Sequence, residues 1–97
     1  MKILAIDHDS ATLDGLTTAL QFHWHDVVVL PATDAEQGLR LFFAHDPDVV
    51  LLEATLPDHS GFDVLRQVRR VSDVPIIMLS ARVDDADQIR ALELGAD

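Results

Sequence analysis

The stretch that decides the fold is Val49-Val50-Leu51-Leu52-Glu53, an apolar run that ends on a carboxylate. A run of this length without polar alternation is typical of a strand that is buried on both faces, as in the centre of a parallel sheet. Glu53 then lies at the carboxyl end of that strand, where open α/β sheets have their binding crevice. A second run, Ile3-Leu4-Ala5-Ile6-Asp7, ends in the same way. If the two strands are neighbours, both acids share one pocket.

The rest of the chain alternates between strand and helix patterns with short connections. Strands are expected over 2–6, 27–30, 48–53 and 75–79, and helices over 10–24 and from about 33, 60 and 84. This βαβαβαβα order predicts an α/β fold, a doubly wound parallel sheet with helices on both faces. The fourth strand is expected to be an exposed hydrophobic edge, and such edges recruit partners.

Side-chain types and spacing predict how the helices begin and which way they face. Three residues are expected to cap the amino ends of the first three helices: Ser10, Thr33 and Ser60. Phe43 and Val71 are expected to face the core at helical spacing. Three arginines of the third helix are expected to face water: Arg66, Arg69 and Arg70. Pro31 is expected to close the second strand.

Composition limits the classes of function. The chain has 97 residues, of which 48% are hydrophobic, enough for one packed domain. It has no cysteine, so disulfides and thiolate metal sites are excluded. The start carries no signal peptide pattern, and no apolar run approaches the ~20 residues that cross a membrane. The net charge of −10 disfavours nucleic-acid binding by this surface. We therefore expect a soluble, cytoplasmic protein.

Four side chains fall at the carboxyl ends of expected strands: Asp7, His8, Glu53 and Ser80. Two neighbouring carboxylates repel unless a cation or a proton lies between them. Asp7 and Glu53 could offer oxygens to Mg²⁺, which prefers an octahedral oxygen shell. His8 fits that ion poorly, because imidazole suits zinc, copper, iron or nickel better. Ser80 could donate a hydrogen bond to an anionic oxygen in the same pocket.

The chain resembles a response-regulator receiver domain, the phosphate-accepting module of two-component signalling. The resemblance covers the whole chain, which would be most of one such domain. It implies a flavodoxin-like (βα)5 fold with strand order 2-1-3-4-5. It is closest to the subfamily with a C-terminal winged-helix DNA-binding domain. It rests on five segments: residues 2–7 with the acid-rich turn after them, 47–52, Leu56-Pro57 with Gly61, 74–81 and 92–97. It implies one receiver domain over 1–97 that ends after helix four, with the last strand and helix, and any effector domain, beyond the chain.

The resemblance also implies the roles of single residues. The family uses an aspartate after strand three as phosphoacceptor, two acids after strand one for Mg²⁺, a Ser or Thr after strand four and a Lys after strand five. Here Glu53 stands at the acceptor position and His8 at that of the second acid, while the Lys position lies beyond the chain. Asp7 and Ser80 match, and the carbonyl of Thr55 falls where a backbone oxygen binds the metal. Asp9 belongs to the same acidic turn.

These departures predict a degenerate phosphorylation site. Glutamate places its carboxylate one methylene further out, and a shift of about 1 Å can cost roughly 100-fold in a positioned reaction. Glu53 either mimics a phosphorylated aspartate or is a drifted acceptor without a signalling state. His8, if protonated, replaces the metal as the counter-charge to Asp7 and Glu53; alternatively it is a solvated loop residue. No cofactor is expected, and Mg²⁺ would bind weakly.

Two functions remain open at this point. The first is an atypical receiver, not an enzyme, that signals by dimerisation or docking and regulates an attached DNA-binding domain. The homodimer would form through the edge of strand four or through helix four, and DNA would be bound only by the missing effector domain. The alternative is a working phosphoacceptor in a histidine-kinase phosphorelay, using Glu53 or a neighbouring acid with Mg²⁺.

Overall fold

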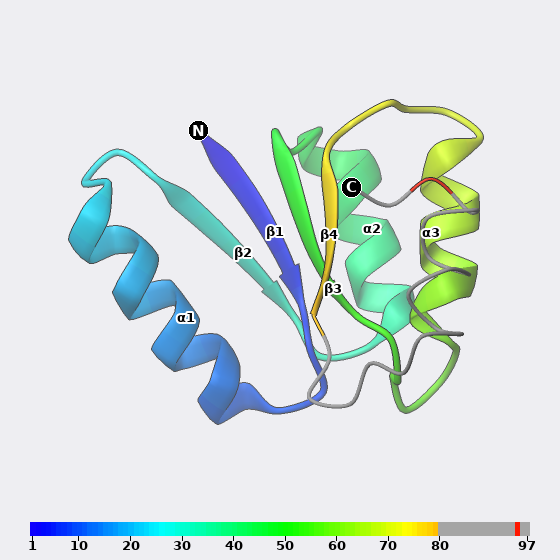
Figure 1. The fold of residues 1–97 in the computed structure, drawn as a ribbon, viewed down its shortest axis with the longest axis horizontal. Helices are drawn as coiled ribbons and strands as arrows, with labels where there is room; N and C mark the ends of the chain where they lie inside the picture. The colour runs from blue at the N-terminus through cyan, green and yellow to red at the C-terminus, as the bar shows by residue number, and fades with distance from the viewer. Residues whose placement is uncertain (80–94, 96–97) are drawn as a thin grey trace.

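The computed structural model describes residues 1–79 and Gly95, which form a parallel sheet flanked by helices (Figure 1). The elements, in chain order, are β1 (Lys2–Ile6), α1 (Ser10–His23), β2 (Val28–Ala32), α2 (Ala35–His45), β3 (Val49–Glu53), α3 (Gly61–Arg69) and β4 (Ile76–Leu79). The strand order is β2-β1-β3-β4, with every pairing parallel. The predicted fold class and strand order are confirmed. The helix expected from about residue 84 lies outside the described residues.

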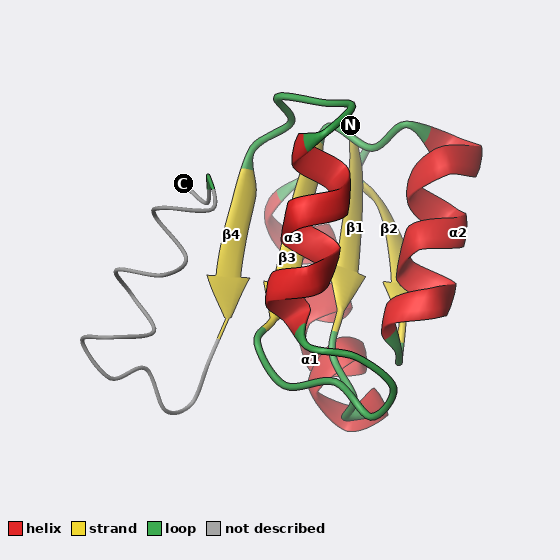
Figure 2. Ribbon diagram, turned by 90° about the vertical axis from the view of Figure 1, so that its right-hand side faces the viewer, coloured by secondary structure: helices red, strands yellow, loops and turns green. Residues whose placement is uncertain are grey.

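The helices cover both faces of the sheet. α2 and α3 pack on one face and α1 on the other (Figures 1 and 2). Within the described residues no helix has the length and apolar character needed to cross a bilayer. β3 lies between β1 and β4, so the apolar run 49–52 forms the interior of the sheet.

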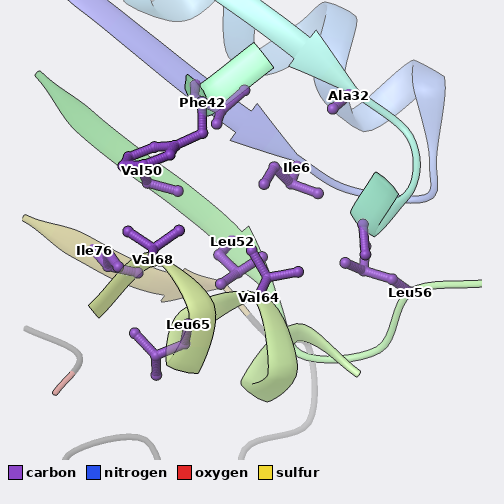
Figure 3. Close-up of a cluster of buried hydrophobic side chains, with 12 residues drawn as sticks. Ile6, Ala32, Phe42, Val50, Leu52, Leu56, Val64, Leu65, Val68 and Ile76 are labelled. Atoms are coloured by element: carbon purple, nitrogen blue, oxygen red, sulfur yellow. The ribbon is translucent and has the colours of Figure 1, made fainter. Parts of the chain in front are cut away.

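The larger part of the core lies between the sheet and helices α2 and α3 (Figure 3). Val50 and Leu52 of β3 point to this side, and both are fully buried. Leu51 points to the opposite side, where Leu13 of α1 contributes to a second cluster. The central strand is therefore buried on both faces, as its sequence predicts. Burying each such leucine stabilises the fold by about 1.5 to 3 kcal/mol.

A glycine allows α2 to lie close to the sheet. A Cβ placed on Gly38 would lie 2.5 Å from Cδ1 of Ile6, a core residue of β1. Glycine in a helix interior costs about 1 kcal/mol relative to alanine. The close packing of α2 on β1, which a glycine at this position allows, offsets this cost.

Two expected helix caps were wrong by one residue. Asp9, not Ser10, is the N-cap of α1, and its side chain accepts a hydrogen bond from the N–H of Ala11. Asp34, not Thr33, is the N-cap of α2 and accepts from the N–H of Gln37. An aspartate lies directly before one expected cap and directly after the other, and aspartate caps at least as well as serine or threonine. Ser60 caps α3 as predicted.

Four expected placements of single side chains were also wrong. Phe43 and Val71 are exposed rather than directed to the core, at 64% and 63%. Arg69 does not simply face water, because its guanidinium donates to the carbonyls of Ser72, Val74 and Gly95. Pro31 lies within β2 rather than ending it. β2 is the terminal strand on its side of the described sheet, where a residue without an N–H is tolerated.

Candidate functional site

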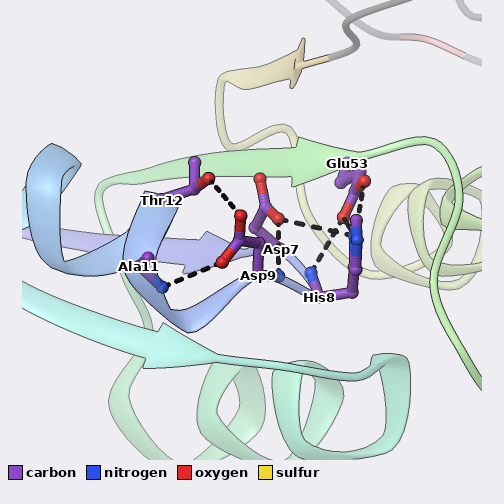
Figure 4. Close-up of polar contacts among 6 residues, drawn as sticks. All are labelled: Asp7, His8, Asp9, Ala11, Thr12 and Glu53. Atoms are coloured by element: carbon purple, nitrogen blue, oxygen red, sulfur yellow. Dashed lines mark hydrogen bonds and ion pairs between the residues drawn. The ribbon is translucent and has the colours of Figure 1, made fainter.

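The carboxyl ends of β1 and β3 bring two acids together, as the sequence predicts. Ile6 is paired with Leu52 in the parallel ladder, so Asp7 and Glu53 follow at the same edge of the sheet. One ligand atom each from Asp7, His8 and Glu53 lies within 4.8 Å of the other two (Figure 4). We call these three residues the edge pocket.

His8 is bound to Glu53 through both its backbone and its ring. Its N–H donates to Oε2 of Glu53 at 2.8 Å, and its Nδ1 lies 2.8 Å from Oε1 and 2.7 Å from Oε2. The His8 side chain is 59% exposed, whereas that of Glu53 is 17% exposed. The imidazole therefore closes over the carboxylate from the solvent side. This geometry supports the counter-charge interpretation over that of a solvated loop histidine.

Asp7 is the buried member of the edge pocket. Its Oδ1 accepts a hydrogen bond from the N–H of Asp9 at 2.9 Å and lies 3.6 Å from Nδ1 of His8. Burial raises the pKa of Asp7, and the neighbouring Glu53 carboxylate raises it further, while the Asp9 N–H opposes the change. Two acids at this separation favour a proton or a cation between them.

Asp9 turns away from the edge pocket and toward α1. Its Oδ1 accepts from the N–H of Ala11 and its Oδ2 from the hydroxyl of Thr12, both at 3.0 Å (Figure 4). Both hydrogen bonds lower the pKa of Asp9, and the one from Thr12 has the larger effect. The sequence groups Asp9 with the acidic turn, but its carboxylate caps the start of α1.

The loop after Glu53 is tightly folded. Thr55 forms an isolated bridge with Ser60, and the N–H of Gly61 donates to the carbonyl of Ala54 at 2.8 Å. A Cβ on Gly61 would lie 2.0 Å from the carbonyl oxygen of Glu53, so only glycine fits here. Ser80, the other expected site residue, lies outside the described residues.

Sequence reasoning missed Asp58, which joins this loop to α2. Its Oδ1 accepts from the N–H of Ala35 at 2.8 Å and its Oδ2 from that of Glu36 at 3.0 Å. These backbone bonds, with one from His59, lower the pKa of Asp58. An acid after Pro57 in a turn is an ordinary pattern, and nothing local to it indicates a partner more than twenty residues earlier in the chain.

The His8–Glu53 contact predicts an elevated histidine pKa. The hydrogen bond to Glu53 and its negative charge raise the pKa of His8 above its usual 6.5. Because the folded value exceeds the unfolded one, this pair stabilises the fold fully below pH 6.5 and loses its contribution as pH rises through the folded pKa. NMR titration of the ring should give a midpoint above 6.5.

The Glu53→Gln variant should bring that midpoint down, because the anionic partner is removed. Glu36→Gln removes an exposed acid that pairs with Arg40 elsewhere and should leave the midpoint unchanged. A wild-type midpoint at or below 6.5 would contradict the ion pair.

Comparison with known proteins places the whole chain in one family. The model of the response regulator receiver domain matches residues 3–97. The chain is 44% identical over 96 residues to a probable transcriptional regulator, ycf27, of Guillardia theta, and 40% identical over 96 residues to the transcriptional regulatory protein AfsQ1 of Streptomyces coelicolor. Each alignment covers 99% of this chain, but 37% of the first relative and 42% of the second, so the chain spans less than half of either.

Solved structures show the same likeness. A two-component response regulator from Clostridium difficile superimposes with a TM-score of 0.93 at 27% identity, over 100% of this chain and 78% of that one. A receiver domain protein from Clostridium thermocellum superimposes with a TM-score of 0.88 at 32% identity, over 98% of this chain and 76% of that one.

Proposed function

Because the chain belongs to the family of response regulator receiver domains, we propose that it is a receiver whose aspartyl-phosphorylation site is degenerate and which signals without ordinary phosphorylation. A receiver is a signalling module of two-component systems rather than an enzyme. The observation that carries the proposal is the contact between His8 and both carboxylate oxygens of Glu53. The two residues that depart from the family pattern are bound to each other.

The contact works against phosphoryl transfer in two ways. Glu53 holds the acceptor position with a side chain one methylene longer than aspartate, which displaces the attacking oxygen from the geometry that the family uses. Both of its oxygens also lie against His8, so attack on a phosphoryl donor must first break this pair. An imidazole in place of an acid removes one hard oxygen ligand, which weakens Mg²⁺.

The other site residues take the following proposed roles. Asp7 is the remaining family acid of the metal position, and the carbonyl of Thr55 is the backbone oxygen beside it. Ser80 is the hydroxyl that would contact a phosphoryl group or the charge of Glu53. Asp9 contributes to the acidic turn by capping α1, which orders the segment that holds His8. No cofactor is required in this proposal, and Mg²⁺ binds weakly.

The relatives suggest the setting in which this receiver works. Two of them are named as transcriptional regulators more than twice as long as this chain. We propose that residues 1–97 form the receiver domain of such a protein, located in the cytoplasm, and that DNA is bound only by an attached effector domain. A histidine kinase is the partner that two-component signalling implies. A homodimer would transmit the signal, either through the edge of β4, where Ile77 is 46% exposed, or through the helix that the sequence predicts from about residue 84.

Acetyl phosphate tests the proposal directly. The protein is incubated with Mg²⁺ and acetyl phosphate beside a receiver that has an aspartate acceptor, and intact masses are measured. We expect the control to gain a phosphoryl mass and this protein to gain none. A phosphoryl mass that appears here and disappears in Glu53→Gln would instead establish the alternative, a working phosphoacceptor in a phosphorelay.

A further inference from the structure

We propose that the edge pocket of Asp7, His8 and Glu53 binds a divalent transition-metal ion of the zinc class in preference to Mg²⁺. The inference deepens the proposed function and rests on it in one respect, that this pocket is the regulatory site of the receiver. It starts from a disagreement between the family and this chain. The family implies Mg²⁺ at this position, and the side chains present here do not fit that ion.

The disagreement lies in the chemistry of the donor atoms. Mg²⁺ requires near-ideal octahedral coordination by oxygen and retains several waters. The edge pocket offers one imidazole nitrogen and two carboxylate oxygens. Imidazole nitrogen combined with carboxylate oxygen is a donor set that zinc accepts, and it also suits copper and nickel. His8 therefore changes the class of metal that the site prefers, rather than only lowering its affinity for Mg²⁺.

The positions of the donor atoms suit a small tetrahedral ion. Ligand atoms around such an ion lie roughly 3.3 Å apart when the metal bonds are about 2.0 to 2.1 Å long. Nδ1 of His8 lies 2.7 Å from Oε2 of Glu53 and 3.6 Å from Oδ1 of Asp7, so the required spacing falls between the two. All three ligand atoms lie within 4.8 Å of one another, so a common centre requires the His8 ring to leave its contact with Glu53 and turn toward solvent, on its exposed side.

The surrounding residues favour a divalent charge. Asp7 is only 9% exposed and lies beside a second carboxylate. Two such acids repel unless a cation neutralises them, and a bound divalent ion would take over this role from the protonated His8 ring. The N–H of Asp9 donates to Oδ1 of Asp7 at 2.9 Å, and a hydrogen bond of this kind to a ligating carboxylate orients it in metal sites. The exposed side of His8 leaves room for water to complete the shell.

The test uses the whole chain with zinc, cobalt or magnesium chloride as the probe. We expect Zn²⁺ and Co²⁺ at a few equivalents to raise the melting temperature, and Co²⁺ to give visible absorption from the bound ion. Millimolar Mg²⁺ should do neither. His8→Ala removes a ligand and should lower Zn²⁺ affinity in calorimetry by at least the roughly 10- to 100-fold that loss of a group supporting a ligand costs. His8→Asp, which restores an all-oxygen set, should shift the preference toward Mg²⁺.

The chain contains a second place where zinc could bind by chance, the exposed pair His23 and His25. The matched control is therefore the double variant His23→Ala/His25→Ala, which should retain the Zn²⁺ effect. An effect that survives His8→Ala, or that disappears in the double variant, overturns the proposal. So does a protein that binds Mg²⁺ as tightly as Zn²⁺.

The metal measurements contain no acetyl phosphate, so they are independent of the phosphorylation test. Zinc selectivity in a protein that also gains a phosphoryl mass on Glu53 would overturn the degenerate-site proposal and support the metal proposal. If the protein neither binds zinc nor gains a phosphoryl mass, the metal proposal is overturned and the degenerate-site proposal stands.

Discussion

The Gly61→Ala variant is expected to lose roughly 3 kcal/mol or more of unfolding free energy, because the added methyl group overlaps fixed backbone. Its Cβ would lie 2.0 Å from the carbonyl oxygen of Glu53 and 2.9 Å from Cα of Ala54. Neither atom can rotate away as a side chain can. Relief requires moving either the end of β3 or the first turn of α3, whose residues Phe62 and Leu65 are buried in the core.

Urea unfolding monitored by circular dichroism measures this loss, and Gly15→Ala is the matched control. Gly15 lies inside α1, and apart from its chain neighbours and the backbone of its own helix nothing lies within 4 Å of the position of a Cβ. Alanine there should stabilise the protein by up to about 1 kcal/mol, since alanine is the better helix former. The two substitutions are chemically identical and should change stability in opposite directions. A Gly61→Ala protein with wild-type stability would show that the loop after Glu53 is not held as described.

The Phe42→Ala variant is expected to lose about 3 to 5 kcal/mol, the usual cost of removing a buried aromatic ring. Phe42 is 5% exposed and packs with Val50 and Val68 in the larger core cluster (Figure 3). The ring fills the space between α2, the sheet and α3, which the neighbouring elements cannot close without moving. The urea midpoint should fall with an unchanged slope if the unfolded state is unaffected.

Phe43→Ala controls for the aromatic residue type and for the helix. Phe43 is adjacent in sequence, belongs to the same helix and is 64% exposed. Its ring meets that of Phe42 edge-on at 5.2 Å, so its removal should cost about 1 kcal/mol or less. Equal losses in the two variants would contradict the burial difference between these neighbours.

The fold was predictable because it depends on sequence patterns that extend over many residues. Apolar runs of four or five residues identify buried strands, and the short connections between them leave few parallel arrangements. Asp7 and Glu53 could be brought together by the same reasoning, since each directly follows such a run. His8 entered the site because it is the next residue in the turn.

Single side chains were less predictable, for identifiable reasons. Consecutive residues of a helix are separated by about 100° around its axis, so Phe42 and Phe43 cannot both face the sheet, and spacing alone does not select one. Val71 lies two residues beyond the end of α3 at Arg69, where helical spacing no longer applies. Arg69 and Asp58 bind backbone groups that are remote or irregular, and no local pattern encodes such partners.

The bonds from Asp58 to α2 also constrain the length of the chain between them. An N-cap normally moves with its own helix, but here part of the capping comes from a loop that belongs to the next βα unit. One residue inserted between Glu53 and Asp58 would carry the carboxylate past the two N–H groups, while Asp34 would still cap the helix. Surface loops usually tolerate insertions and deletions. This one should vary in sequence and not in length.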